Sequence, residues 1–243
     1  MKIAIEINDL PYEAKVALTK DERTSPELLA ALATDKDRRI RILVAWHSST
    51  SSEVLDALAN DCDSVVRKAV AENGNTFAKT LAKLANDIDE DVRSGVGKNK
   101  NTKEETLAML ASDKEGWVRQ AVALNGNTPV ETLDLLATDE DSLVRCAVAV
   151  NKNTSVETLV MLASDEDHCV REAVARNENA PADILTTLAQ DEDIDVRYEV
   201  AANENTSVDV LAMLAQDKNV GVRIRAKDAL QERTVKKEQN IER

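Results

Sequence analysis

The sequence is nearly devoid of aromatic residues, with 2 Trp, 2 Tyr and 1 Phe in 243 positions. A core without aromatics must be built from Leu, Val, Ile and Ala, which suits helices that pack closely through small residues. Only 6 Gly and 4 Pro are present, and no apolar run reaches the roughly 18 residues of a membrane-spanning helix. These shortages exclude a glycine- or proline-rich linker and a membrane span.

Cysteine is also scarce. Cys62, Cys146 and Cys169 are odd in number, widely spaced and without a CxxC pair, which argues against a disulfide framework and against a zinc or iron–sulfur site. Free thiols fit a reducing compartment. The first residues, MKIAIEINDL, lack the long apolar stretch and the cleavage site of a secretory signal. We therefore expect a cytoplasmic protein that uses no cofactor.

What the sequence does contain is one 26-residue unit, repeated eight times without insertion from Thr24 to about Ala226. A threonine opens seven copies, and Ala180 stands in that place in the remaining one. An arginine recurs at the same period, at Arg41, Arg67, Arg93, Arg119, Arg145, Arg171, Arg197 and Arg223. A fixed period of roughly 20 to 50 residues is typical of a solenoid, which stacks one supersecondary unit.

The net charge of −14, from 31 basic and 45 acidic residues, belongs mainly to this repeat. The recurring positions hold 22 acids and 8 arginines, which account for the whole net charge, and 23 acidic and 23 basic residues remain elsewhere. The acidity is therefore mainly architectural. It still repels phosphate groups and disfavours nucleic-acid binding.

The sixth copy shows how the first helix of a repeat is expected to form. Thr154 and Glu157 have the spacing of a capping box, in which the threonine hydroxyl caps the helix. Leu159, Leu162 and Ala163 then give an apolar stripe at i, i+3 and i+4. The same pattern recurs in every copy, so we expect a buried leucine face throughout.

A second helix follows in the same copy. Asp167 has the type and position of its N-cap, and Val170 and Val174 mark its buried side. Asn177 and Asn179 close the copy, where asparagine tolerates the left-handed conformation that ends helices. Residues 26 apart lie above one another in a stack, so these amides are expected to form a ladder between copies.

Asp165 and Arg171 recur at the same interval as the asparagines. They predict a second ladder, in which aspartates and arginines of neighbouring copies pair. A partly buried series of this kind is expected to set the register of the stack.

The string L-x-x-L-A-x-D-x-D-x-x-V-R-x-x-V-A-x-N occurs at 133–151 and 159–177. It resembles the bacterial leucine-rich repeat variant family, relatives of HEAT-type solenoids, over roughly five-sixths of the chain. The resemblance implies a right-handed superhelix of two helical layers, one of them with 3₁₀ turns in that family, and no catalytic constellation. Some members carry an iron–sulfur segment before the repeats, but no cysteine precedes Cys62 here. The longer period of this chain leaves room for two true α-helices.

We therefore predict an all-α, right-handed α-solenoid of eight 26-residue two-helix repeats. A half-repeat N-terminal cap is expected in 1–23, the solenoid in 24–231, and a polar tail in 232–243 after a helical C-terminal cap. Gly95 and Gly97 stand where other copies have alanine. Two interpretations of these glycines remain open, neutral drift and a flex point.

Function is expected on the second helices, at positions opposite the buried valines. Both tryptophans fall on that face, and a contiguous apolar patch rimmed by charge is typical of an interaction site. The alternative is that these side chains pack over the first helix or between copies. The candidate protein-binding residues are Trp46, Trp117, Gln120, Leu124, Leu143, Cys146, Val150, Cys169, Glu172, Arg176 and Tyr198.

Catalysis and metal binding find little support in the sequence. His47 occupies an asparagine position and is interpreted as its substitute in the ladder. Cys146, His168 and Cys169 offer at most three metal ligands. The D-x-D strings lack the glycine and the distal Glu of a calcium loop, and no phosphate loop or nucleophile elbow is present. We assign no catalytic, cofactor-binding or metal residues.

The expected function is that of a monomeric, non-catalytic scaffold that binds another protein, with an inhibitor or immunity protein for a basic toxin as the more specific version. The alternative is a HEAT-like nucleic-acid-binding or DNA-repair module. That alternative requires a basic groove, and the candidate positions hold few Arg or Lys.

Overall fold

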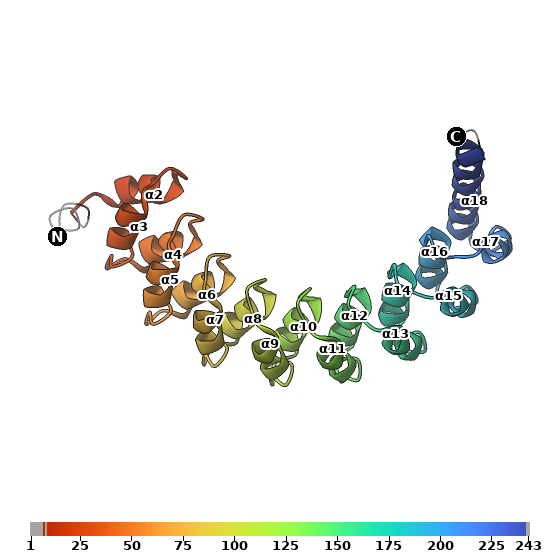
Figure 1. Ribbon diagram of the computed structural model, residues 1–243, viewed down its shortest axis with the longest axis horizontal. Coiled ribbons are helices and arrows are strands. Elements are labelled where there is room, and N and C mark those ends of the chain that lie inside the picture. The colour runs from red at the N-terminus through yellow and green to blue at the C-terminus, as the bar shows by residue number, and fades with distance from the viewer. Residues whose placement is uncertain (1–6, 8, 242–243) are drawn as a thin grey trace. The chain divides into compact units, whose positions relative to one another are not determined.

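The computed structural model describes residue 7 and residues 9–241, with side chains through Thr234, and this part of the chain contains 17 α-helices and no strand. It divides into two compact units, Met1–Thr128 and Pro129–Arg243. The first unit contains α2 (Tyr12–Lys20), α3 (Pro26–Leu32), α4 (Arg38–Trp46), α5 (Ser52–Leu58), α6 (Ser64–Glu72), α7 (Ala78–Leu84), α8 (Glu90–Lys98), α9 (Glu104–Leu110) and α10 (Gly116–Leu124) (Figure 1).

The second unit contains α11 (Val130–Leu136), α12 (Ser142–Val150), α13 (Val156–Leu162), α14 (His168–Arg176), α15 (Ala182–Leu188), α16 (Ile194–Ala202), α17 (Val208–Leu214) and α18 (Val220–Ile241). Helix α18 continues without a break across residues 231 and 232, where the polar tail was expected to begin. None of the described helices is both long and apolar enough to cross a membrane.

Each copy folds into a first helix of 7 residues and a second helix that has 9 residues in every copy but the last. Both are α-helices, and no 3₁₀ helix occurs in the residues that the structure describes, so this chain lacks the 3₁₀ layer that the resemblance implied. The predicted all-α solenoid of paired helices at 26-residue spacing is confirmed.

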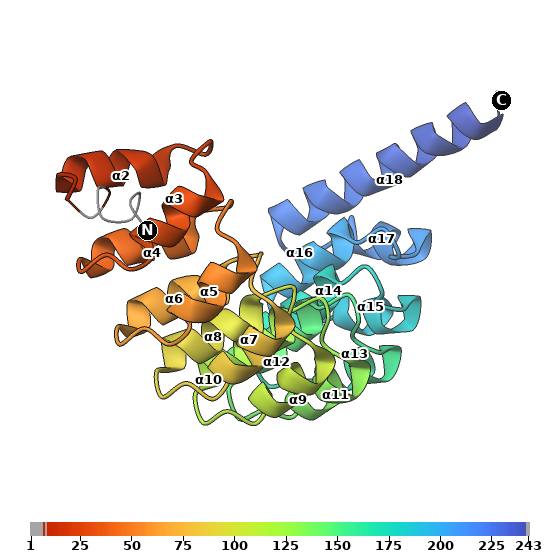
Figure 2. The same ribbon diagram turned by 60° about the vertical axis from the view of Figure 1, so that its left-hand side comes forward.

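The core consists of the predicted apolar stripes. In the sixth copy Leu159, Val170 and Val174 are completely buried, and Leu162 nearly so. Alanines such as Ala173 lie between neighbouring second helices and let these helices approach closely. Consecutive first helices are less closely packed, so within each unit the second helices lie on the inner side of the curve (Figures 1 and 2).

The threonine that opens a copy does not cap the first helix, so the predicted capping box is wrong. The buried Thr154 donates its hydroxyl to the carbonyl oxygen of Val148 at 2.5 Å, at the end of the preceding second helix. The cap is the following residue, Ser155, whose oxygen accepts the amide of Thr158 at 3.1 Å. Sequence patterns place helix starts only to within one or two residues, and two adjacent hydroxyls competed for this position.

Ala180 stands at the threonine position of the seventh copy and provides a test of the hydrogen bond that the threonine hydroxyl makes in the other copies. Ala180 is completely buried, and the carbonyl of Val174 already accepts the amide of Asn177, as in the other copies. Ala180→Thr should therefore add one hydrogen bond and raise the free energy of unfolding of the second unit by about 1 kcal/mol. Urea denaturation measures this change. Ala180→Val adds the same bulk without a donor and is the control; a Thr variant no more stable than the Val variant would contradict the expectation.

The predicted N-caps of the second helices are confirmed in most copies. Asp167 accepts the amide of Cys169 at 2.9 Å, and the same bond forms at Asp37, Asp63, Asp89, Asp141 and Asp193. Glu115 makes no such bond, because its longer side chain does not match this turn. The asparagines end the helices in extended conformation, and no described non-glycine residue has a positive φ, so the left-handed ending predicted for them is wrong.

The asparagine ladder itself is present. Asn177 donates its side-chain amide to the carbonyl of Ala149 at 2.6 Å, in the preceding copy, while its oxygen accepts the amide of Asn179. His47 takes this role in the first copy, with its Nε2 3.1 Å from the carbonyl oxygen of Asp21, as its position in the sequence indicated.

The arginine–aspartate ladder is confirmed within each unit. Arg145 holds the carboxylate of Asp165, one copy further on, through Nε at 2.6 Å and Nη2 at 2.9 Å, and donates Nη1 to the carbonyl of Asp139 at 2.8 Å. Equivalent pairs form between Arg41 and Asp61, Arg67 and Asp87, Arg93 and Asp113, Arg171 and Asp191, and Arg197 and Asp217. Lys15 on α2 occupies the corresponding position and pairs with Asp35 through its Nζ at 2.6 Å.

The two glycines of α8 serve close packing. A Cβ added at Gly95 would lie 3.0 Å from the Cβ of Ala71, and one added at Gly97 would lie 3.1 Å from the Cβ of Ala121. Alanine at these positions would therefore require the neighbouring alanines to shift by a few tenths of an ångström.

Candidate protein-binding surface

All eleven residues predicted to bind a partner lie on second helices. In the first unit these are Trp46 on α4, and Trp117, Gln120 and Leu124 on α10. In the second unit they are Leu143, Cys146 and Val150 on α12, Cys169, Glu172 and Arg176 on α14, and Tyr198 on α16.

Most of these side chains are exposed. Trp46 and Trp117 are 63% and 48% exposed, and Leu143 is 59% exposed, so none of the three belongs to the core. Gln120 and Cys146 are half-buried. Since the second helices form the inner side of each unit, these residues face the inner side.

Within the second unit, several of the candidates form one surface. Leu143, Cys146 and Val150 lie three and four residues apart and so share one face of α12. The Sγ of Cys146 lies 3.8 Å from the carbonyl oxygen of Cys169 on the neighbouring helix α14. We call Leu143, Cys146, Val150, Cys169 and Tyr198 the inner strip.

Charged residues border the inner strip. Arg176 pairs with Glu172 on its own helix and with Glu199 on α16, at 2.9 Å. The first unit has a cross-helix pair with the same spacing of 23 residues, between Lys68 and Asp91 at 3.2 Å. Positions 23 residues apart therefore face each other across neighbouring second helices, and their side chains vary between copies.

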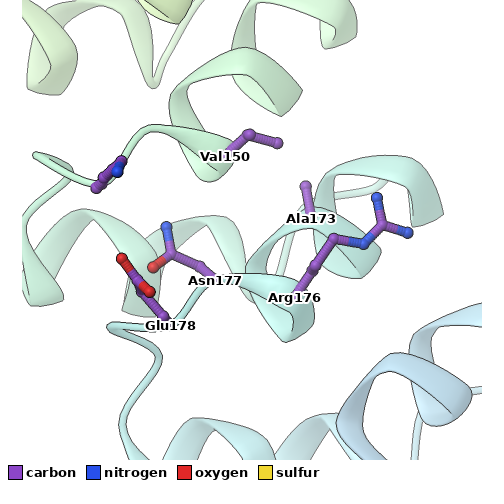
Figure 3. Close-up of a pocket in the computed structure, with 6 residues that line it drawn as sticks. Val150, Ala173, Arg176, Asn177 and Glu178 are labelled. Atoms are coloured by element: carbon purple, nitrogen blue, oxygen red, sulfur yellow. The ribbon is translucent and has the colours of Figure 1, made fainter. Parts of the chain in front are cut away.

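An open hollow of about 270 Å³ lies at the end of the strip near Val150. Its lining also includes Ala173, Arg176, Asn177 and Glu178 (Figure 3). Figure 3 shows Val150 on one side and Asn177 and Glu178 on the other. The hollow offers an apolar wall and three charged groups, from Lys152, Arg176 and Glu178. The side-chain amide of Asn177 is bonded to carbonyls of the preceding copy, so it directs no hydrogen to a ligand.

Exposed apolar residues on the first helices were missed from the sequence. Leu135 on α11 is 57% exposed, and Val160 and Met161 on α13 and Met213 on α17 are 44–45% exposed. The sequence did contain a signal for them, because apolar Leu135, Met161 and Met213 occupy the same position of the repeat. The candidate positions were all on the second helices and therefore did not include these residues.

The thiols of the inner strip are poor nucleophiles. Burial raises the pKa of Cys146, with the nearby Cys169 and Glu172 adding to it, and burial and the charge of Asp167 raise the pKa of Cys169. A reactive cysteine requires a lowered pKa.

The fold and this surface define a helical-repeat solenoid with a fixed framework and variable inner positions. The sequence profile described as "Leucine rich repeat variant" matches residues 116–141 and 170–193. A solved structure of a leucine-rich repeat variant with a novel repetitive structural motif is 28% identical, covers 90% of this chain and 87% of its own, and superposes with a TM-score of 0.65. The resemblance to the leucine-rich repeat variant family that the motif predicted is therefore confirmed by the profile and by the structure.

Two more distant solved structures also match. An engineered protein is 17% identical over 95% of this chain and 93% of its own, with a TM-score of 0.40. An archaeal HEAT-like repeats protein from Thermococcus onnurineus NA1 is 16% identical over 95% of each chain, with a TM-score of 0.29. At these scores neither bears on function. No curated protein matches the chain.

Proposed function

We propose that this chain is a non-catalytic scaffold that binds another protein through the inner strip. The observation that supports this proposal is the exposed apolar surface of Leu143, Val150 and Tyr198 beside a fully satisfied framework. Among the described side chains, no buried nitrogen or oxygen lacks a hydrogen-bond partner. The polar framework is thus satisfied within the fold, and solenoids commonly bind partners on exposed apolar surfaces such as this strip.

The charges around the strip define the kind of partner. Arg176 is held between two glutamates, Glu172 and Glu199, so the border of the strip is net acidic. We propose a partner that presents an apolar contact surrounded by basic residues. An inhibitor or immunity protein for a basic toxin, acting as a monomer in a bacterial cytoplasm, fits this description. Nucleic-acid binding would require a basic border instead.

Leu143→Glu should weaken partner binding at least tenfold, about 1.4 kcal/mol, because it places a charge in the apolar contact. The partner is first captured from the native host, and its Kd is then measured by titration calorimetry. Leu135→Glu is the matched control, since Leu135 is equally exposed, at 57% against 59%, and lies on a first helix of the same unit.

Both variants should keep their free energy of unfolding, because both side chains are exposed. If Leu135→Glu weakens binding and Leu143→Glu does not, the partner binds the first helices instead of the inner strip. A salt-dependent gel shift with duplex DNA, in place of a protein partner, would contradict the proposal and support the nucleic-acid alternative.

A further inference from the structure

The start of α14 brings together three side chains that can ligate a metal. Asp167, His168 and Cys169 each offer a ligand atom, and these atoms lie within 4.8 Å of one another. The Sγ of Cys169 is 3.5 Å from the Nε2 of His168, and the Nδ1 of His168 is 3.8 Å from the carboxylate of Asp167. No framework role explains the meeting of the thiol and the imidazole.

The distance between these two atoms suits a tetrahedral metal ion. Zinc binds thiolate sulfur at about 2.3 Å and imidazole nitrogen at about 2.1 Å, which places the two ligand atoms about 3.6 Å apart at the tetrahedral angle. The observed 3.5 Å allows both to bind one ion without a large movement. Asp167 lies beside the other ring nitrogen, where a carboxylate commonly orients a metal-binding histidine.

The surroundings add acidic groups and a further thiol. An open hollow of about 490 Å³ beside the cluster is lined by Glu140, Ser142, Arg145, Glu166, Asp167 and His168, so three acids face it with a single arginine, and that arginine is paired with Asp165. The Sγ of Cys146, on the neighbouring helix α12, is 3.8 Å from the carbonyl oxygen of Cys169. Sequence reasoning counted at most three ligands because it left out Asp167.

We propose that His168, Cys169 and Cys146, with Asp167 as ligand or orienting carboxylate, bind one divalent cation of the zinc class. Thiolate and imidazole together select such ions over magnesium or calcium. Each thiol releases its proton to solvent as the metal–sulfur bond forms, so affinity increases with pH. The bound ion fastens α12 to α14. The site shares Cys146 and Cys169 with the inner strip, but its test by metal titration needs no protein partner.

Cobalt titration of the full-length protein, kept reduced with a phosphine, tests the site. The expected result is one equivalent of Co²⁺ with a thiolate-to-metal charge-transfer absorption, displaced by Zn²⁺. Cys169→Ser and Cys146→Ser should each remove about half of that absorption or more, and His168→Ala should weaken binding at least tenfold.

Cys62→Ser is the matched control, because Cys62 is an exposed cysteine on the first unit, and its variant should bind like the natural protein. A natural protein without charge-transfer absorption would overturn the proposal, as would a Cys169→Ser variant that keeps all of it. Unchanged absorption in Cys146→Ser would overturn the assignment of Cys146 as a ligand.

Discussion

Replacing Arg145 with Met should lower the free energy of unfolding of the second unit by about 3 kcal/mol, because it leaves the buried carboxylate of Asp165 without its partner. The side chains of Arg145 and Asp165 are only 11% and 8% exposed, so solvent screens the pair weakly. The substitution also removes the hydrogen bond to the carbonyl of Asp139. Urea denaturation followed by circular dichroism measures the change.

Arg223 provides the matched control. It occupies the same position in the last copy and donates to the carbonyls of Asp217 and Lys218, but the next aspartate position of the repeat holds Arg243. Arg223→Met therefore exposes no unpaired carboxylate and should cost about 1 kcal/mol or less. Equal losses for the two variants would show that the ion pair contributes nothing beyond the carbonyl bonds.

The same pair predicts a dependence on pH. Burial alone would raise the pKa of Asp165, but the bonds from Arg145 and from the amide of Asp167 outweigh it, and the pKa lies below the ordinary value of 3.8. The aspartates of the other five arginine pairs are shifted in the same direction. A pKa lowered in the folded state gives stability above the unfolded pKa, and this stability is lost as the pH falls through the folded pKa.

The free energy of unfolding should therefore be nearly constant down to about pH 4 and fall steeply below it. In Arg145→Met the buried, unpaired Asp165 has a raised pKa instead, so protonation relieves the penalty. The difference between the natural protein and this variant should narrow as the pH falls from about 7 to about 3, whereas the difference for Arg223→Met should stay constant. If the difference in free energy of unfolding between the natural protein and Arg145→Met does not change with pH, this account is contradicted.

Asn177→Ala should also destabilise the second unit, by about 3 kcal/mol, because it leaves several backbone groups without their partner. The side chain is only 6% exposed, donates to the carbonyls of Ala149 and Asn151, and accepts the amide of Asn179. Urea denaturation gives the loss, and hydrogen exchange of the Asn179 amide should accelerate.

The chain itself offers the control for this variant. His47 fills the equivalent position of the first copy, with Nε2 beside the carbonyl of Asp21 and Nδ1 accepting the amide of Ser49 at 3.0 Å. Asn177→His should therefore retain a large part of the stability that Asn177→Ala loses. If both variants are equally unstable, the ladder bonds at this position depend on packing rather than on the polar atoms.

Much of the framework was predictable because a repeat places each residue beside its own image 26 positions away. Asn177 and Arg145 could be assigned to ladders for this reason, and both ladders are present. The role predicted for the threonine was wrong. The capping-box pattern relates Thr154 only to the helix that follows it, whereas the Thr154 hydroxyl donates to the helix that precedes it.

The positions that vary between copies were less predictable. The sequence indicated that Leu143 and Cys146 lie on a helix face turned away from the core. It did not show that Leu135, on the layer of first helices, is as exposed as Leu143. Nor did it show that the imidazole of His168 turns toward the thiol of Cys169. Rotamers at exposed positions depend on local neighbours that carry no repeat signal.

The sequence by itself determined the helical class, the period, the buried stripes and the partners that recur between copies, because these follow from periodicity and from the need to satisfy buried polar groups. Only the tertiary structure decided which carbonyl each threonine binds, which helix layer lies on the inner side of each unit, and which variable side chains meet on α12 and α14. These features depend on the spacing and rotation of neighbouring helices, which packing sets and a linear pattern does not encode.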